Sequence, residues 1–223
     1  MLGIIGGTSL LFADLPPLKE EVVATPYGRA VVHSGEICLV PRHQYSRPPH
    51  RINHKAHLAA LKMKGVDRII AFGSVGSLRV KYHPGSLLVP QDFISWGAIP
   101  TFHDGTITHV MPGLDHDLII TLGDIHEDAQ IGGTYVQTTG PRFETAAEVR
   151  ALAEVADMVG MTVASEATLA SELGIRFAAI CNVDNYANGI GDESISYETI
   201  LAAAKAGSRR TSIILQKIVE ELA

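Results

Sequence analysis

Short apolar segments rich in β-branched residues recur along the chain and alternate with segments in which apolar residues have a helical spacing. Several of the short segments lack polar alternation, which is typical of strands that are buried on both faces. They predict strands over Leu2–Ile5, Ala30–His33, Ile37–Pro41, Asp67–Phe72, Ser86–Val89, Gly133–Thr138, Asp157–Gly160 and Ile175–Asn182.

The helical spacing predicts helices over Glu144–Ala156, over Ser165–Leu173 and from Ser196 onward. Strands that alternate with helices predict an α/β fold: a single domain over residues 1–223, with a central mixed, largely parallel β-sheet flanked by helices. The stretch from Phe93 to Leu114 has no clear periodicity, so we expect a surface loop there, and such loops often carry function.

Composition and charge narrow the class of protein. The net charge of -6 argues against a general nucleic-acid binder, and the pair Arg209-Arg210 is more typical of a solvated helix face. No apolar run is long enough to span a membrane, and the first residues do not resemble a signal peptide. Cys38 and Cys181 lie in apolar segments and are expected to be buried free thiols, so we expect a cytoplasmic protein.

Three predicted strands are followed by residues suited to an anion. These segments are Gly3–Ser9, Pro41–Gln44 and Phe72–Leu78. Glycines let the backbone approach an anion closely, and hydroxyls and an arginine fork donate to phosphate. Because ligands of open α/β folds bind beyond the carboxyl ends of the strands, one shared crevice is expected. Taken alone, each segment also fits an ordinary loop, and the glycine spacing does not fit the G-x-G-x-x-G of an NAD-binding protein.

Three later segments combine an aromatic ring, a carboxylate, a carboxamide and hydroxyls, which could hold a flat heterocycle and a sugar. They are Thr139–Thr145, Gly160–Thr162 followed by Glu166, and Asn182–Gly189, all expected in loops at strand ends. The histidines at positions 50, 54 and 57 show no H-E-x-x-H pattern, so we expect solvated or helix-capping histidines and no metal site.

In this order, the six motifs resemble those of the trimeric nucleoside phosphorylase family, which includes methylthioadenosine phosphorylase and low-molecular-mass purine nucleoside phosphorylase. The matching stretches, from Gly3 to about Leu201, are GIIGGTS, PRH, SVGSL with a following Pro-Gly, TTGPRFET, VGMT with ASE, and NYANGI. The ASE segment departs from the family's usual VPE. The resemblance implies the nucleoside phosphorylase fold and a pentosyltransferase of purine salvage that splits a nucleoside into a purine and a pentose 1-phosphate. Inorganic phosphate is the co-substrate, and no metal or organic cofactor is implied.

The resemblance also implies roles for individual residues. Phosphate would be bound by Thr8, Arg42, His43, Ser74 and Thr162. The nucleoside would be bound by Phe143, Glu144, Met161, Asn185, Tyr186, Ala187, Tyr197 and His109, the last from a neighbouring subunit. Catalytic roles are implied for His43, Glu144 and Asn185. The implied assembly is a homo-oligomer, either a trimer or a dimer of trimers, with no nucleic-acid or membrane partner.

Three positions indicate which base is bound. Family members that cleave methylthioadenosine carry a short hydroxyl residue at Glu144 and an Asp-x-Asp pair at Asn185 and Ala187. In a 6-oxopurine, N1–H can donate to the Glu144 carboxylate, and the Asn185 amide can donate to O6 or N7. Adenine N1 is an acceptor and would face Glu144 at a cost of about 1–3 kcal/mol.

These residues therefore predict a purine nucleoside phosphorylase specific for inosine, guanosine and/or S-methyl-5'-thioinosine. The alternative is an S-methyl-5'-thioadenosine phosphorylase with an unusual base pocket. A register in which Asp184 rather than Asn185 meets the base would reverse the preference. Tyr197 is compatible with either a 5'-hydroxyl or a methylthio group and leaves the sugar open.

Overall fold

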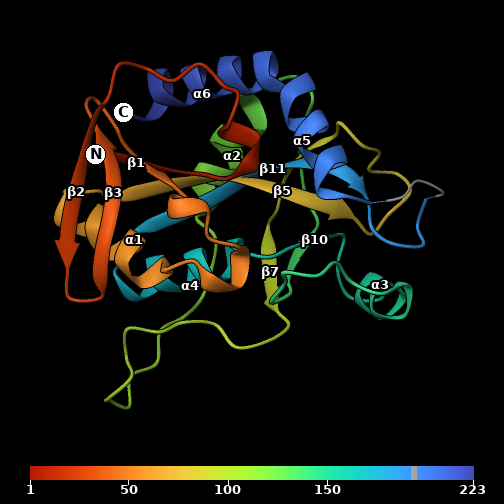
Figure 1. Cartoon of the computed structure of the whole chain (residues 1–223), viewed down its shortest axis with the longest axis horizontal. Coiled ribbons are helices and arrows are strands. Elements are labelled where there is room, and N and C mark those ends of the chain that lie inside the picture. The colour runs from red at the N-terminus through yellow and green to blue at the C-terminus, as the bar shows by residue number, and fades with distance from the viewer. Residues whose placement is uncertain (192–194) are drawn as a thin grey trace.

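The computed structural model describes residues 1–191 and 195–223, and in this part of the chain eleven strands form one sheet with helices on both faces (Figure 1). The strands are β1 (Leu2–Gly6), β2 (Lys19–Thr25), β3 (Gly28–Ser34), β4 (Cys38–Pro41), β5 (Arg68–Ser77), β6 (Leu87–Val89), β7 (Asp92–Ser95), β8 (Ala129–Ile131), β9 (Thr134–Gln137), β10 (Met158–Gly160) and β11 (Arg176–Tyr186). The helices are α1 (His54–Met63), α2 (His116–Asp124), α3 (Ala146–Ala153), α4 (Val163–Glu172), α5 (Tyr197–Ala206) and α6 (Ser208–Leu222).

The predicted α/β architecture is confirmed. The sheet is mixed, with the path β2-β3-β4-β1-β5-β10-β9-β7, and β11 joins it through β5. Pairings among β1, β4, β5 and β11 are parallel, whereas β2 and β3 form an antiparallel hairpin at one edge. All eight predicted strands are present; β2, β7, β8 and the helices α1 and α2 were not predicted.

Strand β5 is the central strand of the sheet, and three other strands pair with it. Residues Arg68–Phe72 lie between β1 and β11, which both run parallel to β5. From Gly76 onward, antiparallel β10 takes the place of β1. The predicted end of this strand at Phe72 is therefore wrong: the strand continues to Ser77, and β11 pairs with it over this segment.

Strand β11 is also longer than predicted. It continues to Tyr186, so much of the expected Asn182–Gly189 loop is strand. Between Val183 and Asn185 the register with β5 shifts, which leaves Asp184 as the extra residue of a β-bulge. A bulge changes where the side chains after it point, so the pairing alternation before Asp184 does not predict the position of Asn185.

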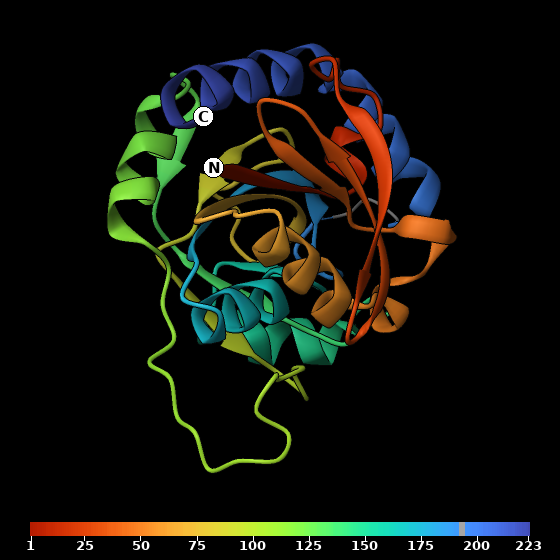
Figure 2. The same cartoon turned by 90° about the vertical axis from the view of Figure 1, so that its left-hand side faces the viewer.

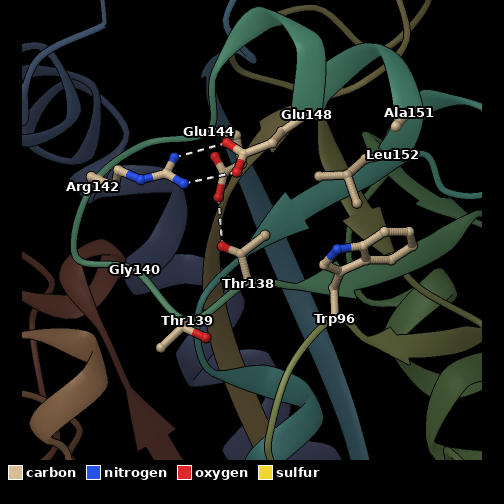
Figure 3. A pocket seen from close by; sticks show the side chains of 9 residues that line it. All are labelled: Trp96, Thr138, Thr139, Gly140, Arg142, Glu144, Glu148, Ala151 and Leu152. Atoms are coloured by element: carbon tan, nitrogen blue, oxygen red, sulfur yellow. Dashed lines mark hydrogen bonds and ion pairs between the residues drawn. The ribbon is translucent and has the colours of Figure 1, made fainter.

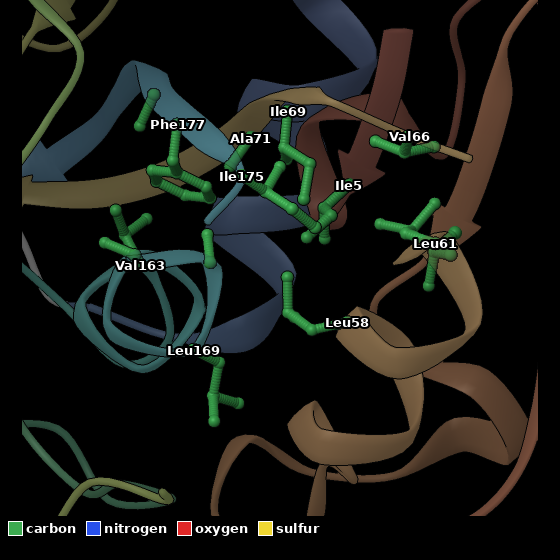
Figure 4. Packing of buried hydrophobic residues seen from close by; sticks show 14 of the residues in the cluster. Ile5, Leu58, Leu61, Val66, Ile69, Ala71, Val163, Leu169, Ile175 and Phe177 are labelled. Atoms are coloured by element: carbon green, nitrogen blue, oxygen red, sulfur yellow. The ribbon is translucent and has the colours of Figure 1, made fainter. Parts of the chain in front are cut away.

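The core has three clusters of buried side chains, and the two larger clusters form layers on opposite faces of the sheet. Alternate residues of β5 serve different layers: Ile69 and Ala71 pack toward α1 and α4, and Ile70 and Phe72 pack toward α2 and α6. Figure 4 shows the first layer, in which side chains of the strands pack against Leu58 of α1 and Leu169 of α4. This double burial is the reason why the central strands have no polar alternation.

Helix α4 is capped by the neighbouring strand β9. The phenol oxygen of Tyr135 accepts hydrogen bonds from the backbone N–H of Thr162 (3.2 Å) and of Val163 (3.3 Å). Gln137 accepts from the backbone N–H of Ser165 (2.9 Å) and donates to its hydroxyl (2.7 Å). The Thr162 side chain makes no capping bond within the described residues. Its hydroxyl is therefore available to a ligand while the helix end is satisfied.

Residues 96–115, between β7 and α2, form a long loop that extends away from the body of the molecule (Figure 2). This confirms the expected surface loop over Phe93–Leu114, apart from its first residues in β7. Within this loop Ile107 and Met111 are 96% and 90% exposed. None of the helices in residues 1–191 and 195–223 is long and apolar enough to cross a bilayer.

The cap on α4 yields a stability prediction. Tyr135→Phe removes the acceptor of two buried N–H groups, so we expect the free energy of unfolding in urea to fall by about 1–3 kcal/mol. Tyr27→Phe is the matched control, because Tyr27 is 39% exposed and packs against Phe102 through its ring. Equal stability of the Tyr135 and Tyr27 variants would contradict the capping role.

Candidate functional site

Three of the expected anion-binding segments meet where β1 ends beside β5. The last paired residue of β1, Gly6, lies opposite Phe72, and the Gly6 carbonyl accepts a 2.7 Å hydrogen bond from the backbone N–H of Arg42. A side chain at Gly7 would collide with the Arg42 guanidinium, so only glycine allows this approach. Thr8 follows directly and is half-buried. The segments that carry Thr8, Arg42 and Ser74 are therefore adjacent to one another at the ends of β1 and β4, beside β5.

Arg42 is buried and forms a two-pronged ion pair with Glu166 of α4. Its Nε and Nη2 donate to the two carboxylate oxygens at 2.6 and 2.9 Å, and its Nη1 donates to the Phe72 carbonyl at 2.8 Å. Burial alone would lower the pKa of Arg42, but the charge and hydrogen bonds of Glu166 raise it, so the guanidinium stays charged. Three of its five N–H groups are used in this way, and the other two have no partner within residues 1–191 and 195–223.

Glu166 also connects Arg42 to Thr162. The Glu166 backbone N–H donates to the Thr162 carbonyl in the first turn of α4 (3.3 Å). The ion pair therefore holds Thr162 near Arg42, although 124 residues separate Arg42 from Glu166. The sequence showed Glu166 only as a residue after the Met161-Thr162 motif, and no local pattern indicates its partner.

Three histidines lie around this pair. His43 is half-buried, and its Nδ1 donates to the Arg47 carbonyl at 2.9 Å, because a carbonyl can only accept. Burial lowers the pKa of His43, which favours the neutral ring, whose Nε2 is then an acceptor. His54 and His57 are buried, which corrects the expectation that they are solvated or capping: Asn53 caps α1 instead. Burial lowers the pKa of both rings to about 3.

Glu144 lies in a second part of the candidate site, away from the Arg42 ion pair. The Glu144 carboxylate is buried and accepts a short hydrogen bond from the Thr138 hydroxyl (Figure 3). Its backbone carbonyl accepts from the Asn188 amide at 3.2 Å, which ties the loop before α3 to the segment after β11. A cavity of about 230 Å³ opens beside Glu144 and extends to Trp96. Of the predicted residues only Glu144 lines it, so the cavity adjoins the expected base site rather than containing it.

Asn185 lies next to Gly76 on β5. A side chain at Gly76 would come within 3.4 Å of both the Asn185 amide nitrogen and Val159, so these residues surround one small space. One N–H of the Asn185 amide donates to the Tyr186 carbonyl at 2.7 Å, and the second is free for a ligand among the described residues. Ala187 is buried and follows the same strand, and its N–H donates to the Ser77 carbonyl.

The remaining predicted residues are less closely gathered. Met161 is half-buried, and a side chain at Gly140 would strike its sulfur, so the loop before Phe143 packs on Met161. Phe143 and Tyr197 are exposed, and His109 belongs to the extended loop over 96–115. Thr138, which the sequence did not single out for a role, also lies beside the site. So does Asp184, which the sequence offered only as an alternative to Asn185.

Comparison with known proteins places this geometry in context. A family profile described as the Phosphorylase superfamily matches residues 1–220. The chain is 40% identical over 235 residues to the "Probable 6-oxopurine nucleoside phosphorylase" of Archaeoglobus fulgidus, covering 100% of this chain and 97% of that protein. It is 37% identical to the "Probable S-methyl-5'-thioinosine phosphorylase" of Methanocaldococcus jannaschii, covering 99% and 91%. It is also similar to the structure of a methylthioadenosine phosphorylase from an antarctic soil metagenomic library, with TM-score 0.81, 27% identity and coverage of 100% and 87%.

The buried ion pair yields a second prediction. Glu166→Leu leaves the Arg42 charge without compensation, so we expect the free energy of unfolding to fall by about 3–5 kcal/mol. Adding Arg42→Met should recover part of this loss, because the double variant buries no charge. Arg142→Met is the control: Arg142 pairs with Glu148 in the same two-pronged way, but it is 66% exposed and its loss should be far less costly. Equal effects of Glu166→Leu and Arg142→Met in urea unfolding would contradict the assigned burial.

Proposed function

This chain belongs to the phosphorylase superfamily, and we propose that it is a purine nucleoside phosphorylase that acts on 6-oxopurine nucleosides. The observation that carries the proposal is the base-side geometry: a buried Glu144 carboxylate, oriented by Thr138, together with an Asn185 amide that has a free N–H. This pair offers one acceptor and one donor, as a base with N1–H and O6 requires.

We place the phosphate between Arg42 and the ends of β1 and β10. Arg42 has two N–H groups left, and Thr8, Ser74 and Thr162 bring hydroxyls to the same region. His43 is neutral and has an acceptor Nε2, which suits the one O–H of hydrogen phosphate. The ion pair with Glu166 supports a fixed direction for the Arg42 donors, and such preorganisation makes charge stabilisation effective.

The reaction follows from this placement. As the bond from the sugar to purine N9 breaks, positive charge develops on the sugar and negative charge on the purine. A phosphate held beside the anomeric carbon attacks it and forms the pentose 1-phosphate. The half-buried Met161 would pack under the sugar, and Phe143, on its exposed loop, would close over the purine. Positioning and electrostatics supply the acceleration in this scheme, so we propose no metal or organic cofactor.

The names of the two sequence relatives mention 6-oxopurine nucleosides and S-methyl-5'-thioinosine, whose base is also a 6-oxopurine. They support the same base preference and leave the sugar open between ribose and methylthioribose. An S-methyl-5'-thioadenosine phosphorylase is the alternative, as the similar solved structure carries that name. It is less well supported, because adenine N1 would face the Glu144 carboxylate and Ala187 offers no acceptor for a 6-amino group.

We also propose a homo-oligomer built from trimers. The loop over 96–115 extends away from the body of the molecule, exposes Ile107 and Met111, and contains His109. Such a loop can complete the 5' side of a neighbouring subunit, near Tyr197. Cys38 and Cys181 are both free and buried, which supports a location in a reducing cytoplasm.

A phosphorolysis panel tests the proposed function. With inorganic phosphate, inosine, guanosine or methylthioinosine should be cleaved to the base and a pentose 1-phosphate at least tenfold faster than adenosine or methylthioadenosine, by the cost of about 1–3 kcal/mol of a mismatched buried group. Thr8→Val, which keeps the side-chain shape, should raise the apparent KM for phosphate about tenfold or more. Cleavage to free pentose without phosphate, or faster use of the 6-amino nucleosides, would refute the proposal.

Exchanging the base-reading residues should change the preference. Asn185→Asp should lower 6-oxopurine activity at least tenfold, because an ionised carboxylate cannot donate to O6. Asn185→Asp with Ala187→Asp restores acceptors for a 6-amino group, and Glu144→Ser is then needed to relieve the clash at N1. The three effects should be non-additive, since these residues surround one ring. Thermal unfolding of each variant controls for folding, and additive effects in kcat/KM would show that the residues do not share a base.

A further inference from the structure

A buried carboxyl group that has no assigned role lies next to Asn185. Asp184 is only 8% exposed, and its Oδ1 accepts a hydrogen bond from the Asn182 amide at 2.6 Å. Its Oδ2 is buried and has no hydrogen-bond partner among the described residues. A buried carboxyl oxygen without a partner is costly, so its retention points to a ligand group that completes the set.

The β-bulge turns Asp184 toward the same face of the sheet as Asn185. Ser74 and Gly76 are two residues apart on β5, so their side-chain directions share one face. The Ser74 hydroxyl lies close enough to Asp184 to affect the carboxyl, and the Asn185 amide lies against Gly76. In a regular strand, two consecutive side chains would point to opposite faces.

Asp184 is held in place from the opposite layer of helices. Arg210 of α6 donates to the Asn182 carbonyl oxygen at 2.7 Å and to the Gly85 carbonyl at 2.8 Å. Because arginine can only donate, the Asn182 amide must turn its nitrogen toward Asp184. Arg210 is therefore not merely a solvated helix residue, as its sequence context suggested. It fixes one oxygen of Asp184 and leaves the other free.

On a 6-oxopurine, O6 and N7 are adjacent acceptors on one edge of the ring. A protonated Asp184 and the Asn185 amide would be two adjacent donors on one face of β11, which matches the two acceptors of that edge. We propose that Asp184 is a further catalytic residue, which in its protonated form donates a proton to N7 of the departing purine while Asn185 donates to O6. This inference rests on the proposed function. Under this inference both residues contact the base, Asp184 at N7 and Asn185 at O6, so the two registers considered for this segment no longer exclude each other.

The proton balance of the step is complete. The Asp184 O–H bond breaks and an N7–H bond forms, while the electron pair of the bond from the sugar to N9 moves into the purine ring. The base leaves neutral, and a phosphate oxygen bonds to the anomeric carbon. Hydrogen phosphate loses its own proton as it becomes the sugar phosphate, and one proton returns to the Asp184 carboxylate. The overall reaction therefore takes up and releases no net proton.

The surroundings of Asp184 favour the acid form. Burial raises its pKa to about 6, against the opposing effects of the Asn182 amide, which donates to it, and of the nearby Ser74 hydroxyl. No charged group dominates this shift; Arg210 is one hydrogen bond further away, and Cys181 is a neutral thiol whose pKa is raised by burial. A bound phosphate anion raises the pKa of Asp184 further, since like charges disfavour the ionised form.

The test compares inosine with 7-methylinosine, whose ring nitrogen already carries the methyl group and the positive charge that a proton would bring. In Asp184→Asn we expect kcat for inosine to fall about 10²–10⁴-fold, the usual contribution of a general acid. Turnover of 7-methylinosine should change about threefold at most, because it needs no proton at N7. Equal losses on both nucleosides would overturn the inference and indicate a structural role.

The pH dependence gives a second readout that needs no destabilising variant. In wild type, kcat for inosine should fall as the pH rises through the Asp184 pKa, and kcat for 7-methylinosine should lack this fall. Ser74→Ala removes a group that lowers the pKa, so it should move the inosine profile to higher pH. Identical profiles for the two nucleosides would overturn the inference. If wild type cleaves neither nucleoside with phosphate, the proposed function itself fails.

Discussion

Two opposite charges are buried side by side where β1, β5 and α4 meet, and neither could remain there without the other. Removing a guanidinium and a carboxylate from water costs several kcal/mol for each ion, and only good geometry can offset that cost. Arg42 meets this condition with two bonds to Glu166 and one to the Phe72 carbonyl. Because the three partners come from three different elements, the ion pair requires the end of β4, the middle of β5 and the first turn of α4 to keep one arrangement.

The same arrangement explains how the two halves of the site are separated. Helix α4 takes its capping acceptors from Tyr135 and Gln137 of β9, and the loop that carries Glu144 follows directly from the end of that strand. The proposed anion side and the proposed base side of the site therefore both depend on β9 for support. Each side still has its own local network, with Glu166 orienting the arginine and Thr138 orienting the base-side carboxylate.

Much of the fold could be predicted from the sequence, because strands buried on both faces appear as uninterrupted apolar runs. Strand β2 was missed because it lies at an edge, where its Lys and Glu residues are exposed and mask the alternation. The residues proposed for the site were chosen from local motifs of glycine, hydroxyl and charge. The partners of those residues were not, since the bond from Arg42 to Glu166 joins positions far apart in the sequence. The bulge at Asp184 depends on register with β5, which no local pattern encodes.

A regular strand presents only every second side chain to a ligand on one face. The extra residue in β11 removes this restriction, because two consecutive side chains, Asp184 and Asn185, face the same side of the sheet. No additional strand or loop is needed to bring them together. A single inserted codon can therefore add a functional group to an existing binding strand while the hydrogen-bonded ladder on either side is kept. Insertions of this kind give evolution a short route from a strand that only recognises a ligand to one that also acts on it.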